Sequence, residues 1–443
     1  MKKYIDIKFL AILLLLVSSA CETDFDNPNA ATDEQTYSSR EGLLAAAVGM
    51  QQLYSTTGLR WIVETPAITT REVAIRSTFL NLIELEEGGT PLPNFNTNTD
   101  GMWSTNYRVL KVGEDIEANV PALNWEPGTQ SGLLAYAKLF KALAVGSLAQ
   151  NFEQVIIETN QEGNAVFVSR QEGLNFAIQQ LTEAASLIAA NPVSTEFRNE
   201  VTAGSIDLRN TIQAMLARYN LFAGNYEAAI TAANNVDQSS VSLFRYDLLN
   251  LNPIWSRVYL NNAPNWKPRD RFGLPAEFNI NPADGRTDFY LIPLDALNQN
   301  GLPIEDLAGF FDENTEAIPV YLPDEMNLII AEAHLRKASP DMQAAVTALN
   351  IVRTDNNDPL GVNANIGAYS GEMTVNAILK DIYLNRRLEL YLQGMSLEDS
   401  RRFGRPQPSG ESRIFTEERN RNFYPYPERE RNSNPNTPSD PAI

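Results

Sequence analysis

One stretch near the C-terminal end constrains the fold more than any other part of the chain. Between Ile378 and Gly404, apolar side chains recur three and four positions apart without an intervening proline, which predicts a helix. Apolar residues surround nearly the whole predicted helix, so we expect it to be buried. Arg386 and Glu389 stand three residues apart, and we expect them to pair because an unpaired buried charge is costly. Gly394 loosens the predicted helix before Gly404 ends it.

Further helical patterns occur in pairs along the chain. The predicted pairs lie near 131–191, 206–236, 323–353 and 374–404. Within the second pair, small alanines and a Gly224-Asn225 turn resemble a tetratricopeptide repeat. Such hairpins bury their apolar faces only against neighbouring hairpins, so they stack into a continuous solenoid. We therefore predict a mainly α fold, a tetratricopeptide-like solenoid of helical hairpins with long irregular loop insertions.

The longest predicted insertion is residues 237–322, which lack long helical periodicity and are rich in Pro, Asn and Asp. A loop of this length in a compact protein is usually functional or holds short elements of its own. We place both the helical pairs and this insertion in a single domain, residues 39–443.

The N-terminal segment reads as a secretion signal. Residues 1–20 hold three early lysines, then an apolar run, then small residues, which is typical of a signal peptide. Cys21 follows directly and is the only cysteine, and this arrangement resembles a bacterial lipobox, in which the thiol is lipidated. The alternative is an ordinary secretory signal with an incidental cysteine. Residues 21–38 are polar and rich in turn formers, as expected of an extended tether.

Composition and motifs exclude several classes of function. A net charge of −20 argues against nucleic-acid binding, and a single cysteine leaves no internal disulfide. The chain has one histidine, His334, and lacks phosphate-binding, dinucleotide-binding and nucleophile-elbow motifs. Carboxylate pairs such as Glu86-Glu87 and Asp312-Glu313 could serve a glycosidase, but 55 acidic residues produce such pairs by chance. We expect no metal, no cofactor and no enzymatic activity.

The C-terminal stretch also carries a resemblance to a known family. NRRLELYLQG followed by LEDSRRFG resembles the C-terminal signature of the SusD/RagB family. The chain departs from the usual pattern at Asn385, Gln393 and Leu397. CETDFDNPN after the signal, and YPYP followed by NPN near the end, are also similar to motifs that open and close members of this family. The matching residues of the signature are Arg386, Glu389, Leu390, Gly394, Asp399 and Arg402.

The resemblance implies a location, a ligand and a partner. Members of this family are surface lipoproteins in the outer membrane of Bacteroidota, so the resemblance implies a lipid anchor at Cys21 and a position facing the cell exterior. It further implies capture of a glycan, an oligosaccharide or another oligomeric nutrient, and delivery to a SusC-like TonB-dependent outer-membrane transporter. Two alternatives stay open: a secreted glycan hydrolase, and a structural transporter lid without a ligand site of its own.

The candidate ligand residues come from the irregular segments. Sugars present apolar C–H faces ringed by hydroxyls, and loops on a rigid scaffold often carry binding residues. We favour Trp266 over Trp255, because APNWKPRDR surrounds it with polar and cationic residues; the alternative is that either tryptophan plugs a loop against the core. The predicted ligand-binding residues are Trp255, Tyr259, Asn261, Trp266, Arg269, Asp270 and Arg271 in one segment, and Asn94, Phe95 and Asn96 in another.

Overall fold

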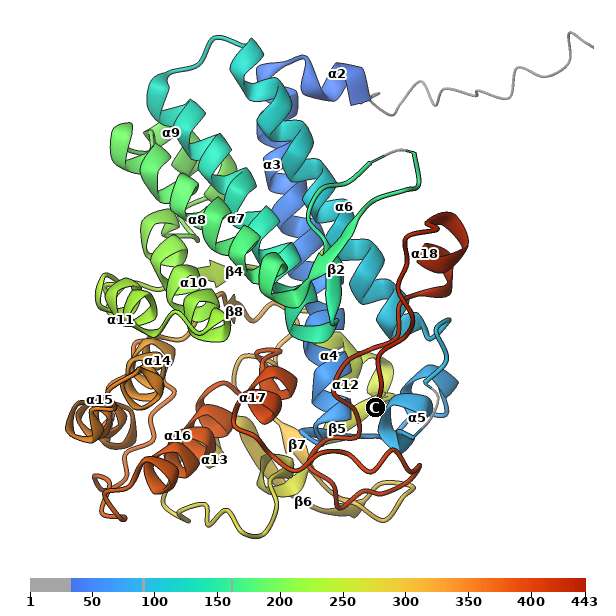
Figure 1. Ribbon diagram of the computed structural model, residues 1–443, viewed down its shortest axis with the longest axis vertical. Helices are drawn as coiled ribbons and strands as arrows, with labels where there is room; N and C mark the ends of the chain where they lie inside the picture. The colour runs from blue at the N-terminus through green and yellow to red at the C-terminus, as the bar shows by residue number, and fades with distance from the viewer. Residues whose placement is uncertain (1–32, 90–91, 161) are drawn as a thin grey trace, which may run out of the picture.

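The computed structural model describes residues 33–89, 92–160 and 162–443. The predictions for Cys21, the signal at 1–20 and most of the tether at 21–38 lie outside the described residues. The described part is mainly α-helical, and its strands form only short two-stranded pairs. The helical repeats make up one side of the molecule, and the strands within residues 266–307 lie towards the other (Figure 1), whereas one two-stranded pair lies beside the repeats.

One long central helix, α7 (Pro127–Asn151), packs against α3 (Arg40–Leu53) and α6 (Thr97–Asn119), which precede it in the chain. α7 is long and apolar enough to cross a membrane by length and composition, but most of it is buried among the other helices, as a core helix requires. Gly146 allows close packing here, since a Cβ atom at this position would lie 2.3 Å from the Tyr219 ring. The helices that precede α7 are α2 (Asp33–Tyr37), α3 (Arg40–Leu53), η1 (Tyr54–Gly58), α4 (Leu59–Thr69), α5 (Leu80–Glu87), α6 (Thr97–Asn119) and η2 (Val120–Ala122).

The predicted helix pairs form and pack in a continuous row. α7 packs on α8, α8 on α10, α11 on α14, and α14 on both α15 and α16. Gly224 ends α10 in the left-handed conformation with φ of 82°, which glycine adopts without a steric cost. This row confirms the predicted solenoid. Its members after α7 are α8 (Arg170–Ala190), α9 (Thr195–Phe197), η3 (Arg198–Thr202), α10 (Leu208–Ala223), α11 (Tyr226–Asn234), α14 (Pro323–Arg336), α15 (Met342–Thr354) and α16 (Val375–Glu389).

The prediction of one helix from Ile378 to Gly404 is wrong in its continuity. α16 ends at Glu389, and a separate helix, α17, runs over Ser396–Arg402. The turn between them has Leu392 and Gly394 in the left-handed region, with φ of 54° and 77°. A Cβ atom at Gly394 would approach the Ile62 carbonyl oxygen to 2.9 Å, so a glycine lets the turn pack closely against α4.

The predicted pair of Arg386 with Glu389 is also wrong, although both residues are buried and charge-paired as expected. Arg386 donates from Nε to Asp399 Oδ2 at 2.7 Å, across the turn between α16 and α17. Glu389 instead accepts from Arg286 Nη1 at 3.3 Å. Arg402 donates to both Asp399 and Glu332, so Arg386, Asp399 and Arg402 of the signature form a buried network with Glu332 that joins α14, α16 and α17. The three-residue spacing predicted that Arg386 would pair with Glu389 on the same helix, but the turn brings Asp399 of α17 close enough to pair with Arg386 instead.

The strands hold the irregular segments together. β1 (Val73–Ile75) pairs antiparallel with β5 (Trp266–Pro268), and β2 (Gln154–Ile156) pairs with β3 (Phe167–Ser169). The predicted insertion at 237–322 therefore contains short elements rather than one open loop. These are β4 (Leu243–Phe244), α12 (Trp255–Val258), η4 (Leu260–Asn262), β5, η5 (Asp270–Gly273), α13 (Gly285–Tyr290), β6 (Leu291–Leu297), β7 (Pro303–Leu307) and β8 (Ile318–Pro319).

The C-terminal segment returns to the N-terminal half of the chain. The Arg71 guanidinium donates to the Ile414 carbonyl oxygen at 3.1 Å, and the Tyr424 hydroxyl bonds to Thr69 Oγ1 at 2.8 Å. The last helix, α18 (Glu428–Ser433), follows. The end of α4 is thereby fixed on the side that also carries β1 and β5.

Candidate ligand-binding site

Two loops line a hollow of about 520 Å³, which we call the loop hollow. The elements next to these loops, α5, α12 and β5, lie on the side away from the repeats (Figure 1). One loop, residues 76–79, joins β1 to α5. The other runs over residues 256–265, from α12 through η4 to the residue before β5. The residues that line the hollow are Arg76, Ser77, Thr78, Phe79, Ser256, Arg257, Leu260, Asn261, Ala263, Pro264 and Asn265.

A buried carboxylate fixes the base of this site. Glu64 on α4 has no exposed surface, and its oxygens accept hydrogen bonds from three elements. Arg257 donates to Glu64 from Nε and Nη2. Trp266 donates from Nε1 to Oε2 at 2.8 Å, and Asn98 donates from Nδ2 to Oε1 at 3.0 Å. Because a buried charge must be both paired and hydrogen-bonded, Glu64 holds α6, α12 and β5 in a fixed relation beneath the hollow.

Backbone hydrogen bonds then join the two loops to each other. The Asn265 carbonyl oxygen accepts from the backbone N–H groups of Arg76 at 2.8 Å and Ser77 at 3.1 Å. The Asn265 N–H in turn donates to the Arg257 carbonyl oxygen at 2.8 Å. Asn261 and Asn262 both adopt left-handed backbone conformations, with φ of 57° and 54°, which asparagine tolerates better than most residues. Both loops are thereby held by the protein without a ligand.

Apolar side chains remain exposed beside these polar groups. Phe79 is 56% exposed and Leu260 is 42% exposed, and each lies on a different loop of the hollow. Arg76 and Asn261 are also exposed among the lining residues. An aromatic side chain that shares a hollow with amide and guanidinium groups can bind a ligand that has both apolar faces and hydroxyl groups.

Trp266 does not belong to this surface, and its selection as the favoured ligand residue is wrong. Its side chain is 0% exposed, because Trp266 lies in β5 opposite Ile75 of β1 and its indole donates to buried Glu64. A ring without exposed surface cannot stack on a sugar. Trp266 supports the loop hollow from below, which is the alternative the sequence had left open.

The other residues predicted between 255 and 271 divide between the hollow and its surroundings. Asn261 lines the hollow, whereas Trp255 is half-buried at the start of α12. The hydroxyl of half-buried Tyr259 donates to the Leu307 carbonyl oxygen on β7. Arg269 forms an ion pair with Asp270 at 3.5 Å. These side chains are not among the lining residues, so they do not converge on one site.

Arg271 and the loop at 94–96 also lie outside the lining residues. Arg271 donates from Nη2 to the Phe278 carbonyl oxygen at 2.6 Å. Asn96 is buried and caps α6, and its Nδ2 donates to the Asn81 carbonyl oxygen at 2.9 Å. The backbone carbonyl oxygen of half-buried Asn94 accepts from the Glu428 N–H at 2.9 Å, and Phe95 is the most exposed residue of that loop at 64%.

One feature of the sequence could have indicated the first loop of the hollow. Residues 64–85 are rich in apolar side chains, and the loop that carries Arg76 and Phe79 lies within this segment. The polar run Arg76-Ser77-Thr78 between two apolar runs marks that loop. No local pattern indicated that this loop would meet residues 256–265, which lie far along the chain.

Within 33–89, 92–160 and 162–443, no group of three or more His, Cys, Asp or Glu side chains is placed to hold a metal ion. Glu86 is buried and accepts hydrogen bonds from the Ile75 backbone and the Asn298 side chain, and burial raises the pKa of its carboxyl. His334 lies on α14, where burial and the charge of Lys337 lower its pKa. Glu86 is therefore part of the packing and not one of an accessible catalytic pair.

Known proteins similar to this chain are found by superposing structures and not by comparing sequences. No family model and no curated protein matches the sequence. A SusD superfamily protein from Parabacteroides distasonis superposes with a TM-score of 0.68 at 15% identity, covering 94% of this chain and 100% of that one. A SusD-like carbohydrate-binding protein from Bacteroides fragilis gives 0.67 at 15% identity, covering 91% of this chain and 100% of that one.

A third similar structure is the surface glycan-binding protein A from Bacteroides uniformis. It superposes with a TM-score of 0.68 at 14% identity and covers 91% of this chain and 99% of that one. At such low identity these superpositions establish the arrangement of the helices and not the ligand. The chain has the SusD-like fold over nearly its whole length, as the C-terminal signature predicted.

Proposed function

We propose that this protein is a SusD/RagB-type lipoprotein that binds glycans at the cell surface through the loop hollow. The bound glycan would then pass to a TonB-dependent outer-membrane transporter. Support for glycan binding comes from the chemistry of the hollow together with the SusD-like fold, since two proteins of this fold carry names that describe carbohydrate or glycan binding.

The observation that carries the proposal is the exposed Phe79 ring above a rigid polar base. A sugar ring has an apolar C–H face that can stack on an aromatic ring, and hydroxyls that bond to Asn and Arg side chains. The loop hollow supplies the ring from Phe79 and donors from Arg76 and Asn261. Because Glu64 and Asn265 already hold both loops, little loop ordering remains to oppose binding.

The composition of the hollow favours binding over hydrolysis. Canonically a glycosidase places two carboxyl groups on either side of the scissile bond. Among the described residues that line the hollow there is no Asp or Glu. The nearest carboxylate in the hydrogen-bond network is Glu64, which is buried beneath the surface and bound to Arg257, Trp266 and Asn98.

The anchoring and the transporter partner rest on the sequence. Cys21 directly follows a signal-like segment, and the acidic residues after it are similar to a surface-export signal of Bacteroidota lipoproteins. Each buried CH₂ of an acyl chain contributes about 0.8 kcal/mol to membrane binding, so a stable anchor takes more than one chain. A Cys21→Ala variant should move from the membrane fraction to the soluble fraction. Retention in the membrane with the signal cleaved would contradict the lipid anchor.

Isothermal titration with a panel of oligosaccharides tests the glycan site. The wild-type protein should bind at least one oligosaccharide, and Phe79→Ala should weaken that binding at least about ten-fold, or about 1.4 kcal/mol. Phe95→Ala is the matched control, because Phe95 is also an exposed phenylalanine but does not line the hollow.

Other results of this titration would contradict parts of the proposal. Full affinity in Phe79→Ala, or an equal loss in both variants, would remove the site from the loop hollow. Release of shorter sugars during the incubation would favour the hydrolase. The absence of heat with every oligosaccharide that the transporter imports would favour a lid without a ligand site.

A further inference from the structure

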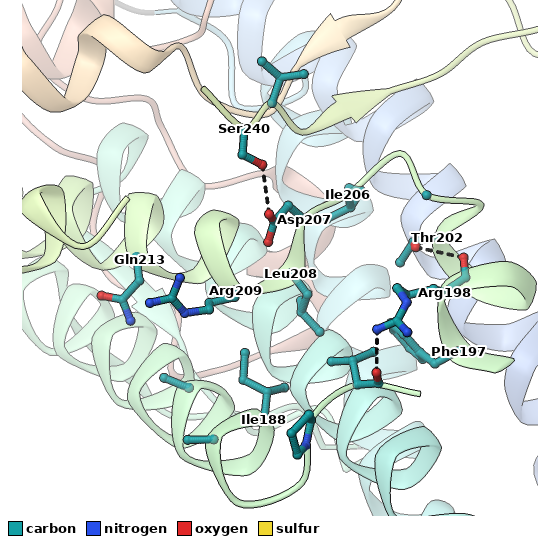
Figure 2. Close-up of a pocket in the computed structure, with 16 residues that line it drawn as sticks. Ile188, Phe197, Arg198, Thr202, Ile206, Asp207, Leu208, Arg209, Gln213 and Ser240 are labelled. Atoms are coloured by element: carbon teal, nitrogen blue, oxygen red, sulfur yellow. Dashed lines mark hydrogen bonds between the residues drawn. The ribbon is translucent and has the colours of Figure 1, made fainter. Parts of the chain in front are cut away.

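A second hollow, of about 940 Å³, lies on the repeat side of the molecule, and we call it the repeat groove (Figure 2). It is bounded by the C-terminal part of α8, by the linker 191–207 and by the first turns of α10. It shares no lining residue with the loop hollow.

The groove exists because α10 does not cover the last turns of α8. Ala185, Ile188 and Ala189 face the hollow from α8 with short or half-buried side chains. The linker reverses direction at Ala203 and Gly204, both in the left-handed region with φ of 46° and 68°, before α10 begins. The gap is thus built by the backbone of the repeats.

The floor of the repeat groove offers apolar contact. The contact surface comes from the half-buried side chains of Ile188 and Val193 and from exposed Ala189 and Pro192, which lie over the buried side chains of Phe197, Ile206 and Leu208. The polar atoms next to this floor already have partners. Asp207 accepts from the Asn210 backbone at 3.1 Å and from Ser240 Oγ at 2.8 Å, and Thr202 donates to the Arg198 carbonyl oxygen at 3.1 Å. Burying one large apolar side chain of a partner here is therefore favourable.

The rim of the groove carries two cationic side chains. Arg198 donates to the Val193 carbonyl oxygen at 2.6 Å and to Thr195 Oγ1 at 3.2 Å, which holds its charge over one end. Arg209 is exposed at the other end (Figure 2), and no hydrogen bond or ion pair is formed by its side chain among the described residues. The carboxylates that face these arginines are Asp207, which caps α10, and Asp237, whose pKa is lowered chiefly by hydrogen bonds from Ser239, with a smaller effect of Arg209.

We propose that the repeat groove binds a short acidic peptide segment of a partner protein, with one large apolar side chain between its acidic residues. The apolar anchor would lie on half-buried Ile188, above the buried side chain of Leu208, and the flanking carboxylates would meet Arg198 and Arg209. In a chain of net charge −20, the two arginines at the rim of the groove outnumber its single lining carboxylate, and this local positive charge favours an acidic partner. This inference does not depend on the glycan site.

The separation of the two arginines favours a peptide over a small anionic amphiphile. A fatty acid carries one charged head, so it needs a cation at one end of an apolar site. Here a cation stands at each end of the apolar floor (Figure 2), which fits a segment with carboxylates on both sides of its anchor.

Fluorescence anisotropy with a labelled five-residue peptide tests the proposal. The probe has a central phenylalanine flanked on each side by two acidic residues. Binding should be saturable, weaken as salt is raised, and fall at least ten-fold for Arg209→Glu and for Ala189→Asp. Both substituted residues are exposed, so the variants should fold. Arg245→Glu is the matched control, because Arg245 is an exposed arginine outside the groove.

Several outcomes would overturn the proposal. Equal binding of a probe with lysines in place of its acidic residues would show that the groove does not select acidic peptides. Equal binding of a probe with alanine in place of phenylalanine would show that the apolar anchor is not recognised. Binding of dodecanoate without binding of the peptide would assign the groove to an amphiphile. A dimer in sedimentation velocity that Arg209→Glu dissociates would assign it to a second copy of the chain. Unchanged peptide affinity in both groove variants would place the peptide elsewhere.

Discussion

The loop hollow and the repeat groove belong to the same chain, but different interactions hold the residues that line them. The loop hollow rests on a buried ion pair, Glu64 with Arg257, and on backbone bonds to Asn265. The repeat groove is a gap in helix packing, with an apolar floor that includes Phe197 and Leu208. A buried charged pair and backbone hydrogen bonds therefore hold the two loops of the hollow, whereas the charged side chains that line the repeat groove, Arg198, Asp207 and Arg209, are exposed or half-buried.

The comparison predicts its largest effect at Glu64. Glu64→Ala leaves the Arg257 guanidinium and the Trp266 indole N–H without their buried acceptor, and removal of one partner of a buried pair costs about 3–5 kcal/mol. Urea denaturation should show this loss, and glycan binding should disappear while peptide binding in the repeat groove is kept by the folded fraction. A loss of less than about 1 kcal/mol would mean that Glu64 does not hold the loops.

Leu388 tests the packing of the repeats. Its side chain is 1% exposed on α16, and Leu388→Ala should cost about 2–5 kcal/mol through lost burial and the cavity left behind. Thermal unfolding measures the effect, and glycan affinity at a temperature where the variant is folded should be unchanged. An unaltered melting temperature would contradict the burial of this residue.

On the repeat side, the contribution of Glu332 to stability should depend on pH. Burial of Glu332 would raise its pKa, but the charges of Arg402 and Arg336 prevail and lower it to about 2. Because the folded pKa lies below the unfolded value, this group contributes stability above about pH 4.5, and the contribution is lost as the pH falls towards 2. It amounts to about 3 kcal/mol. Comparison of wild type with Glu332→Gln by urea denaturation at about pH 6 and about pH 3 should show the difference between them shrinking in acid. A constant difference would contradict the lowered pKa.

The smallest expected effects on the free energy of unfolding come from substitutions in the two binding surfaces. Phe79→Ala and Arg209→Glu replace exposed side chains, so each should change the free energy of unfolding by no more than about 0.5 kcal/mol. Each should remove only its own binding activity, glycan for Phe79 and acidic peptide for Arg209. A loss of both activities in either variant would show that the two surfaces are coupled.

The helices were predictable from sequence because their apolar period is local. The pairs at 206–236 and 323–353 formed close to the predicted limits, with Gly224 in the predicted turn. The break between α16 and α17 was not predicted, since it requires Leu392 in a left-handed conformation that no residue preference indicates. The partner of Arg386 could not be predicted either, because Asp399 reaches it only after that break.

The site was less predictable, because it depends on contacts between distant segments. The neighbours of Trp266 are polar, which suggested exposure, but buried Trp266 and Pro268 flank half-buried Lys267 with the alternation of a strand. This alternation was the available signal for burial. The pairing of β5 with β1 brings Asn265 to Arg76, and only that pairing assembles the loop hollow.

Hydrogen–deuterium exchange with a bound oligosaccharide tests the central claim most directly. With a ligand identified by titration, backbone amides in residues 76–79 and 256–265 should exchange more slowly than in the free protein. Amides in residues 188–213 of the repeat groove should exchange at an unchanged rate. Protection confined to the repeat groove, or no protection at 76–79 and 256–265 at saturating ligand, would contradict the assignment of glycan binding to the loop hollow.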